Sequence, residues 1–338
     1  MTQNRRTFLQ SAGFMVGAAA TTGASAVFAP SIARADNGFP NRAVRLVVPF
    51  TPGGGADRSM RLLAPYLEAE LGQAVQVENV AGAGGWVAWS QVAAWDPEED
   101  DHDLACVNFP HLFSYMDPRV QREETLDDFN IIAWHSTDPS VWCVREDDDR
   151  FRSLEEFLDY AIARPNELII SSTAIGSDNH ISLAYAEKMI DGLQLRHAYS
   201  DGDSEKIQQI LSGDSDIVSG NVGYYTQFFL EAQLRPICVM YPERWSQLPS
   251  VPTFEEVTGV RNVSFAGRTI AAAKGLAPEK EEIYRNAIEA AIANPEYIVR
   301  ELENRNVLTF ASGDEMNQRL SEAEQIVADS EFWQVDEG

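Results

Sequence analysis

The chain has 338 residues, and its 26 Lys and Arg stand against 52 Asp and Glu, a net charge of −26 at pH 7. This length is typical of two domains of roughly 150 residues each, and a hydrophobic content of 44% excludes general disorder. The sequence has no Lys- and Arg-rich stripe, which argues against a nucleic-acid partner, because phosphate backbones require one.

The first 35 residues have the three parts of an export signal. Arg5-Arg6 precedes Phe8-Leu9, a Gly- and Ala-rich run follows, and Ala33-Arg34-Ala35 forms an A-x-A cleavage site. The paired arginines and the mild hydrophobicity favour the twin-arginine route. A retained membrane anchor is the alternative, although the apolar run is short for a span. We therefore expect a periplasmic protein that begins at residue 36 after cleavage.

Strand and helix patterns alternate in the first half of the mature chain. They predict strands at residues 42–50, 74–79 and 104–107, and helices at 57–71 and 87–94. Glycine-rich loops follow the first two strands, at residues 51–55 and 81–85. Alternation of this kind predicts a parallel sheet with helices on both faces.

The second half repeats this order. Ser153 predicts a helix start, and the loop Gly176-Ser177-Asp178-Asn179-His180 opens a helix that runs to about residue 190. The remaining predicted elements are strands at 141–144, 168–171, 216–218 and 236–240, and helices at 205–211, 279–293 and 316–328. The sequence thus predicts an α/β fold of two lobes, each with a strand-to-helix loop that contains glycine.

The loop with Gly53, Gly54 and Gly55 leaves backbone N–H groups uncovered at the start of a helix. Such a site binds anions without Lys or Arg, because the helix adds its positive N-terminal end. Ligands of open parallel sheets bind at the carboxyl ends of the strands, where these loops lie. The alternative, of similar weight, is that the glycines only make turns.

Other kinds of site fit the sequence less well. Ala56-Asp57 follows the glycines where a phosphate-binding loop needs Lys, and neither a G-x-G-x-x-G nor a G-x-S-x-G motif is found. The acidic run at 100–103 reads as a solvated turn, and the loop at 201–205 lacks the glycine and the glutamate of a calcium loop. We therefore expect no catalysis, no metal and no cofactor.

Three cysteines, Cys106, Cys143 and Cys238, are too few for a disulfide framework. One disulfide with one free thiol is possible, as are three buried thiols. We favour the second, because Cys143 and Cys238 lie in apolar, strand-like runs.

Several segments, collinear from residue 39 to about 330, carry a resemblance to a known family. They are Phe39-Pro40-Asn41-Arg42, Leu46–Asp57, Leu71–Asn79, Gly82-Ala83-Gly84-Gly85, Ser171-Ser172, Gly176-Ser177, His180, Gly213–Asp216, Leu248–Thr253 and Gly275–Pro278. In these segments the chain resembles the substrate-binding proteins of tripartite tricarboxylate transporters, the Bug family.

The resemblance implies a bilobed periplasmic binding protein, similar to type II, whose two lobes are joined by a hinge and close on a small organic acid. It implies that backbone N–H groups and water, from one strand-to-helix loop in each lobe, hold the ligand carboxylate. The positions that it assigns to ligand binding are Thr51, Pro52, Gly53, Gly54, Gly84, Gly85, Trp86, Asn108, Phe109, Gly176, Ser177, Asp178, Asn179, His180 and Asp216. Asp57 is expected to cap the first helix or to fix its loop.

Three positions depart from the family pattern or vary within it. Trp86 stands where the family has a small hydroxyl residue, and it provides either an aromatic wall for a ring-bearing acid or plain packing between the lobes. Asp178 adds a carboxylate beside an anion site, which favours either a ligand with an amino group or, our preferred interpretation, a helix cap. Arg268 follows Gly267 near the expected lobe junction.

These features predict a solute-binding protein that delivers a small organic carboxylate to the membrane permease of a tripartite tricarboxylate transporter. The alternative is a ligand-sensing protein that presents its bound state to a membrane sensor kinase. We expect a monomer, with lobe 1 at residues 36–138 and 263–338 and lobe 2 at 139–262.

Overall fold

The computed structural model describes residues 38–303 and 307–334, so the predicted export signal lies outside the described residues. Three parallel strands, in the order β2 (Val75–Asn79), β1 (Val44–Val48) and β3 (Asp103–Phe109), begin the sheet. Helices α1 (Gly55–Leu71) and α2 (Trp86–Ala93) connect them, as predicted. We call this group of strands and its helices lobe 1.

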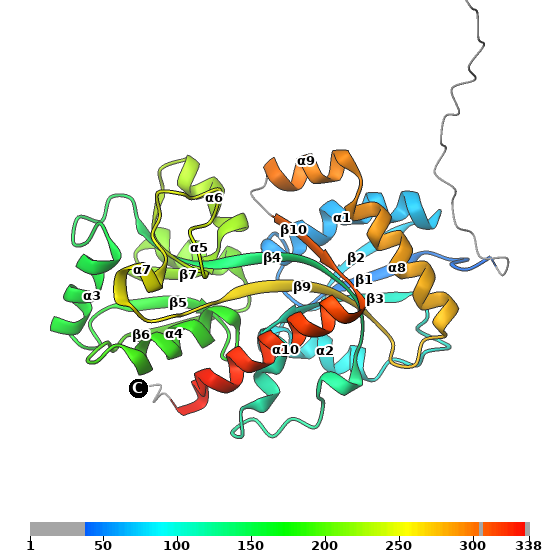
Figure 1. Cartoon of the computed structure of the whole chain (residues 1–338), viewed down its shortest axis with the longest axis horizontal. Helices are drawn as coiled ribbons and strands as arrows, with labels where there is room; N and C mark the ends of the chain where they lie inside the picture. Colours follow the sequence, from blue (N-terminus) through cyan, green and yellow to red (C-terminus); the bar gives the residue numbers. More distant parts are fainter. Residues whose placement is uncertain (1–37, 304–306, 335–338) are drawn as a thin grey trace, which may run out of the picture. The chain divides into compact units, whose positions relative to one another are not determined.

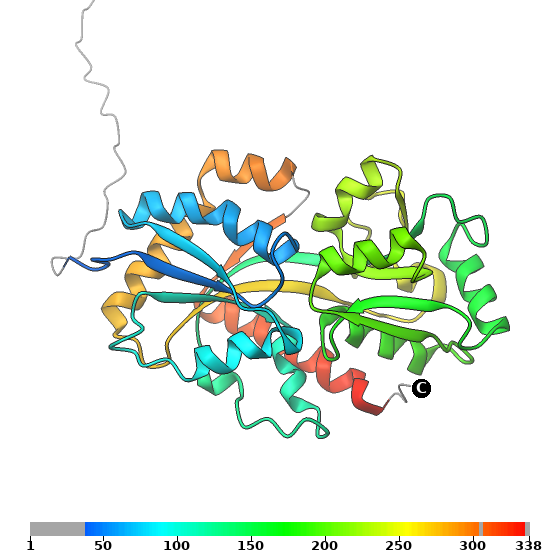
Figure 2. The ribbon, with the colours of Figure 1, turned by 180° about the vertical axis from the view of Figure 1, so that it is seen from behind.

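A second parallel group consists of β7 (Ile217–Asn221), β5 (Ile169–Thr173) and β6 (Arg196–Ser200). The sequence analysis did not predict β6. Helix α3 (Leu154–Ala163) precedes β5, and helices α4 (Asp178–Met189) and α5 (Asp203–Ser212) connect the three strands. We call this group lobe 2, and Figure 2 shows its green strands apart from the blue and cyan strands of lobe 1.

Two long strands, β4 (Asn130–Arg145) and β9 (Phe265–Ala272), join the two groups and run side by side and antiparallel (Figure 1). The first half of β4 pairs with β9 and with β10 (Val307–Ala311), and its second half pairs with β7 and with β8 (Leu234–Met240). The expectation of a wholly parallel sheet is therefore wrong for these strands, and only residues 141–144 of β4 were predicted.

The other helices pack around this sheet. They are α6 (Val222–Leu230), α7 (Phe254–Thr258), α8 (Pro278–Ile292), α9 (Pro295–Glu303) and α10 (Gly313–Ser330), with short 3-10 turns η1 (Ala83–Gly85), η2 (His111–Met116), η3 (Leu126–Asp128) and η4 (Phe332–Gln334). The terminal helices α8 and α10 match their predictions, whereas α6, α7 and α9 were not predicted.

Three apolar cores hold the fold together. One surrounds β1–β3 with α1, α8 and α10 in lobe 1, and two others lie in lobe 2. Cys106, Cys143 and Cys238 are free and buried in these cores, so the expectation of three buried thiols is confirmed. Separate cores on a shared pair of strands give the bilobed α/β fold that the sequence predicts.

Candidate functional site

The loop between β1 and α1 has the geometry of an anion site. Gly53 has a φ of +82° and Gly54 is the N-cap of α1, so the chain turns sharply and leaves the first N–H groups of the helix uncovered. The Asp57 carboxylate accepts a hydrogen bond from the Gly53 N–H at 2.8 Å and another from the Asn79 side chain at 2.9 Å. Asp57 therefore fixes the loop, one of the two roles expected for it.

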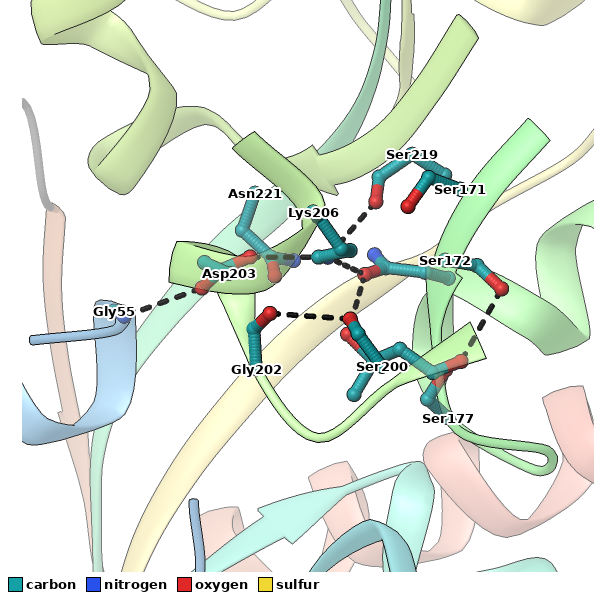
Figure 3. Close-up of polar contacts among 12 residues, drawn as sticks. Gly55, Ser171, Ser172, Ser177, Ser200, Gly202, Asp203, Lys206, Ser219 and Asn221 are labelled. Atoms are coloured by element: carbon teal, nitrogen blue, oxygen red, sulfur yellow. Dashed lines mark hydrogen bonds and ion pairs between the residues drawn. The ribbon is translucent and has the colours of Figure 1, made fainter. Parts of the chain in front are cut away.

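Glycine at position 55 lets two charged groups approach the start of α1. A Cβ atom built on Gly55 would lie 3.0 Å from Nη2 of Arg268 and 3.1 Å from Oδ2 of Asp203. The Gly55 N–H donates a hydrogen bond of 3.1 Å to that Asp203 oxygen (Figure 3). This bond joins lobe 1 to lobe 2 directly.

The loop of lobe 2 that precedes α4 is fixed by its own side chains. The Ser177 hydroxyl caps α4, since it accepts a hydrogen bond from the His180 N–H at 3.1 Å. The Gly176 N–H donates to Nδ1 of His180 at 3.1 Å. The preferred interpretation of Asp178 as the helix cap is therefore wrong, because Ser177 performs that role and Asp178 follows it in the first turn.

Asp178 belongs to a buried polar network. Its Oδ2 accepts hydrogen bonds from the side chains of Ser140, Asn179 and Asn221, at 3.1, 3.2 and 2.8 Å. Burial raises the pKa of Asp178, and the hydrogen bond from Asn221 and the charge of Lys206 offset only part of this effect. This carboxylate lies among neutral donors rather than on a cation.

Lys206 is completely buried, which is rare for lysine unless its protons are paired. Its ammonium donates to Oδ1 of Asn179 at 2.8 Å and to the Ser219 carbonyl at 2.9 Å, and it lies 2.9 Å from Oδ1 of Asp203 (Figure 3). These three contacts use all of its protons. Lys206 thus holds Asp203 at the edge of lobe 2 that faces Gly55.

Arg268, on β9, is buried and forms an ion pair of 3.1 Å with Asp138 on β4. The other oxygen of Asp138 accepts a hydrogen bond from the Gly223 N–H at 2.9 Å. Among the described residues, Nε and Nη1 of Arg268 have no hydrogen-bond partner. A buried guanidinium with two unused donors is costly, so these nitrogens point to an anion that the site would bind.

A cavity of about 30 Å³ lies where these groups meet. It is lined by Phe50, Gly54, Gly55, Ala56, Asn108, His111, Thr173, Asp178, Gly202, Asp203, Asn221, Ala266 and Arg268. Gly54, Asn108 and Asp178 are the predicted ligand-binding residues among them, and the rest of the predicted first loop (Thr51, Pro52, Gly53) adjoins it. A volume of this size holds about one or two water molecules, so the lobes must separate to admit an organic acid.

The predicted set left out five polar residues of the cavity: Arg268, Asp203, His111, Thr173 and Asn221. Nε2 of His111 is buried and unpartnered among the residues that the structure describes. Burial, with smaller effects of His180 and Arg122, lowers its pKa to about 3, so the imidazole is neutral at pH 7. A charged residue inside the apolar run of β9 was the signal for Arg268, because a buried charge requires a partner.

Other predicted site residues serve the contact between the lobes. A Cβ built on Gly84 would lie 2.7 Å from Cβ of Ala174, and one built on Gly176 would lie 2.3 Å from Cβ of Ser114. These glycines therefore allow the loops of lobe 2 to lie against lobe 1. Gly85 has a φ of +99°, a conformation that side chains disfavour.

Trp86 and Phe109 lie among side chains of lobe 1. The Trp86 indole N–H donates to the Ser114 hydroxyl at 2.8 Å, and Arg122 stacks over its ring at 4.2 Å. Phe109 packs against Phe113 and Trp134. Trp86 also borders a second, larger hollow of about 440 Å³ that reaches Ala174 and Ile175 of lobe 2.

The structure does not bring Asp216 to the cavity. It precedes β7, where it pairs with Arg150 at 2.7 Å and accepts a hydrogen bond from the Ile169 N–H at 2.8 Å. Asn221, which lines the cavity, lies at the opposite end of β7, roughly 17 Å away at 3.3 Å per residue. Asp216 anchors the starts of two strands in this structure.

Comparison with known proteins decides the family. Residues 59–329 match the family described as "Tripartite tricarboxylate transporter family receptor". The chain belongs to this family. A UPF0065 protein from the tcbD-tcbE intergenic region of a Pseudomonas species is 30% identical over 301 residues, which covers 88% of this chain and 85% of that protein.

Solved structures agree on the receptor's fold. A protein of Rhodopseudomonas palustris with adipate superposes with a TM-score of 0.79 at 24% identity, over 87% of this chain and 97% of that one. MatC from the same organism, with bound malate, has a TM-score of 0.76 at 22% identity, over 86% and 100% of the two chains. The family resemblance seen in the sequence is therefore confirmed, and the family is one of solute-binding receptors.

Over residues 38–303 and 307–334, no three or more His, Cys, Asp or Glu side chains gather in an arrangement that could hold a metal ion. Within the same ranges, no helix has the length and apolar character needed to cross a membrane.

Proposed function

We propose that this receptor captures a small organic carboxylate in the cavity between the lobes and delivers it to a membrane permease. One observation carries the proposal: the buried Arg268 guanidinium, two of whose nitrogens find no hydrogen-bond partner in residues 38–303 and 307–334, lines a cavity beside the start of α1. A carboxylate there accepts hydrogen bonds from Arg268 and from the Gly55 N–H, and it lies at the positive end of the helix dipole.

The contacts between the lobes support a mechanism of opening and closing. Gly55 bonds to Asp203, and Gly84 and Gly176 lie against the opposite lobe. These contacts must part to admit ligand, and the chain segments that flex are the middle of β4, which pairs with β9 in its first half and with β7 in its second, and the segment that leads into β9. We place the lobe limits near residue 138, on β4, and near residue 262, just before β9.

Relatives support the class of ligand. Two proteins of this fold were solved with adipate and with malate, both small organic acids. The export signal predicted in the first 35 residues supports a periplasmic protein that uses the twin-arginine route, and family membership supports a permease of the tripartite tricarboxylate type as its partner.

The test is a thermal-shift screen of residues 36–338, stripped of carried-over ligand, against mono-, di- and tricarboxylates, aromatic acids and amino acids. A ligand at 100 times its Kd adds about 2.7 kcal/mol to the free energy of unfolding, a rise in Tm of roughly 5 °C. The protein is expected to respond to at least one class of acid.

Arg268→Lys is the matching variant, because it keeps the positive charge beside Asp138 but loses the planar set of donors. We expect it to weaken binding of that acid at least about tenfold, whereas Arg285→Lys, on the surface of α8, leaves binding unchanged. A screen with no responding acid, or equal binding by Arg268→Lys and wild type, would contradict the proposal.

A further inference from the structure

The two sides of the cavity have opposite polarity. Lobe 1 and β9 present donors: the Gly55 N–H at the start of α1, and Nε and Nη1 of Arg268. Lobe 2 presents acceptors, the carboxylates of Asp203 and Asp178. In this structure the two sides of the cavity meet through the hydrogen bond from Gly55 to Asp203, and the Thr51 and Ser204 hydroxyls lie 3.5 Å apart beside it.

Asp203 occupies the place of an anion at the start of α1. Its Oδ2 accepts from the Gly55 N–H, as a ligand carboxylate would, while Lys206 holds Oδ1 from inside lobe 2. A ligand that enters between the lobes separates this pair. Its carboxylate then faces Gly55 and Arg268, and its other end faces Asp203 and Asp178.

The charges of the site are unbalanced on the side of lobe 2. Arg268 pairs with Asp138 and Lys206 pairs with Asp203. Asp178 has no ion-pair partner within the described part of the chain, and its bonded neighbours Ser140, Asn179 and Asn221 are neutral. His111 adds no positive charge at pH 7, because its pKa is lowered to about 3 by burial. Asp178, whose pKa is raised by burial and only partly offset by the Asn221 hydrogen bond and the charge of Lys206, thus lacks a directly paired cation, and a ligand ammonium beside it would stabilise its ionised form.

We propose that the ligand is an amino carboxylic acid, whose carboxylate lies on Arg268 and the start of α1 and whose ammonium lies between Asp178 and Asp203. This inference rests on the proposed function and narrows its ligand class. The ligand carboxylate takes the place of Asp203 as acceptor of the Gly55 N–H. The ligand ammonium takes the place of that N–H as donor to Asp203, in a hydrogen bond between two charged groups. A dicarboxylate instead places its second carboxylate against two buried acids, which like-charge repulsion and desolvation disfavour.

The experiment compares acids that differ at one end only. Ligand-stripped protein is titrated by calorimetry with alanine, β-alanine and 4-aminobutyrate, then with propionate and butyrate, which lack the ammonium. Malonate, succinate and glutarate carry a second carboxylate in its place. We expect one of the amino acids to bind at least about tenfold more tightly than every acid without an ammonium.

Asp178→Asn tests the residue itself. An asparagine keeps an oxygen for the hydrogen bonds of Ser140 and Asn221, but it removes the charge. We expect this variant to bind the amino acid at least tenfold more weakly and the matched dicarboxylate more tightly. Asp191→Asn, an exposed position after α4, is the control and leaves both affinities unchanged. If Asp178→Asn does not fold, as judged by its urea transition, Asp203→Asn takes its place.

The outcomes separate the two proposals. Binding of a plain carboxylate or a dicarboxylate at least as tight as that of every amino acid overturns the zwitterion and leaves a carboxylate receptor. Unchanged preference in the Asp178→Asn variant also overturns the zwitterion. Failure of every acid in the series, together with no response in the wider screen, overturns the proposed function itself.

Discussion

Substitution of Gly176 by alanine tests whether ligand binding depends on the contact between the lobes. Gly176 has a φ of +79°, and a Cβ atom placed there would lie 2.3 Å from Cβ of Ser114 in lobe 1. Real Cβ atoms essentially never come closer than 3.0 Å to another atom, so the lobes must move apart locally by at least ~0.7 Å, the difference of these distances. The clash exists only in the closed conformation.

The expected magnitude follows from two costs. A left-handed alanine costs about 1–2 kcal/mol in both the open and the closed conformation, so it lowers stability but not affinity. Overpacking costs about 1–3 kcal/mol more in the closed conformation alone. We expect the ligand-bound conformation to keep Gly176 against Ser114 although Gly55 and Asp203 separate, so the Kd of the ligand should rise roughly 5- to 150-fold.

The control is Gly259→Ala in lobe 2. Gly259 has a similar φ of +73°, but a Cβ there meets nothing within 4 Å. It should therefore lose about the same stability in urea unfolding while its Kd, measured by calorimetry with the best acid of the screen, stays at the wild-type value. Small-angle scattering at saturating ligand should show a larger radius for Gly176→Ala than for Gly259→Ala. Equal affinities of the two variants would show that ligand binding does not depend on the contact between Gly176 and Ser114.

Three further predictions concern stability and chemistry. Asp57→Asn should destabilise the protein by about 1–3 kcal/mol at pH 7. Burial raises the pKa of Asp57, but hydrogen bonds from Gly53, Arg61 and Asn79 lower it by more, so this difference should begin to shrink below about pH 4, the pKa of an unfolded aspartate, and disappear as pH falls through the lowered pKa of the folded state. A difference in urea unfolding that stays constant over this range would count against the prediction. Between pH 7 and 4.5 the free energy of unfolding of the wild type should fall by roughly 2–3 kcal/mol more than that of His111→Gln. The reason is that His111 is protonated in the unfolded chain, where its pKa is near 6.5, but stays neutral in the folded protein, where burial lowers its pKa to about 3. Equal falls in the two proteins would show that His111 is accessible to protons in the folded state. The three buried thiols should resist a thiol reagent in the native protein and all react in denaturant; fewer than three after unfolding would indicate a disulfide.

The sequence was sufficient for the parts of the fold that local signals determine. The glycines after β1 and the apolar spacing of α1 predicted a strand, a tight loop and a helix, and Ser153 predicted the start of α3. The pairing of β4 with β9 could not be predicted in this way. Both strands are buried on both faces, so neither shows alternation, and their partners lie more than a hundred residues apart.

The candidate site was predicted where backbone forms it and missed where distant side chains form it. The loop at 51–55 lies beside the cavity as expected, but the N–H groups of Gly53, Gly54 and Gly55 donate to Asp57, Thr51 and Asp203 in this structure. Asp203 reaches Gly55 from 148 residues away, and Arg268 meets Asp138 across 130 residues. No local spacing encodes such pairs. Asp216 is the opposite case. The family resemblance assigned it to ligand binding, whereas in this structure it pairs with Arg150 and does not line the cavity.

The most direct test of the account is a crystal structure of the complex with the acid that binds most tightly. We expect the two lobes to be closed around the ligand. Its carboxylate should lie within hydrogen-bond distance of Nε or Nη1 of Arg268 and of the Gly55 N–H, and the hydrogen bond between Gly55 and Asp203 should be broken. A ligand held outside this cavity, or one whose carboxylate contacts neither group, would contradict it.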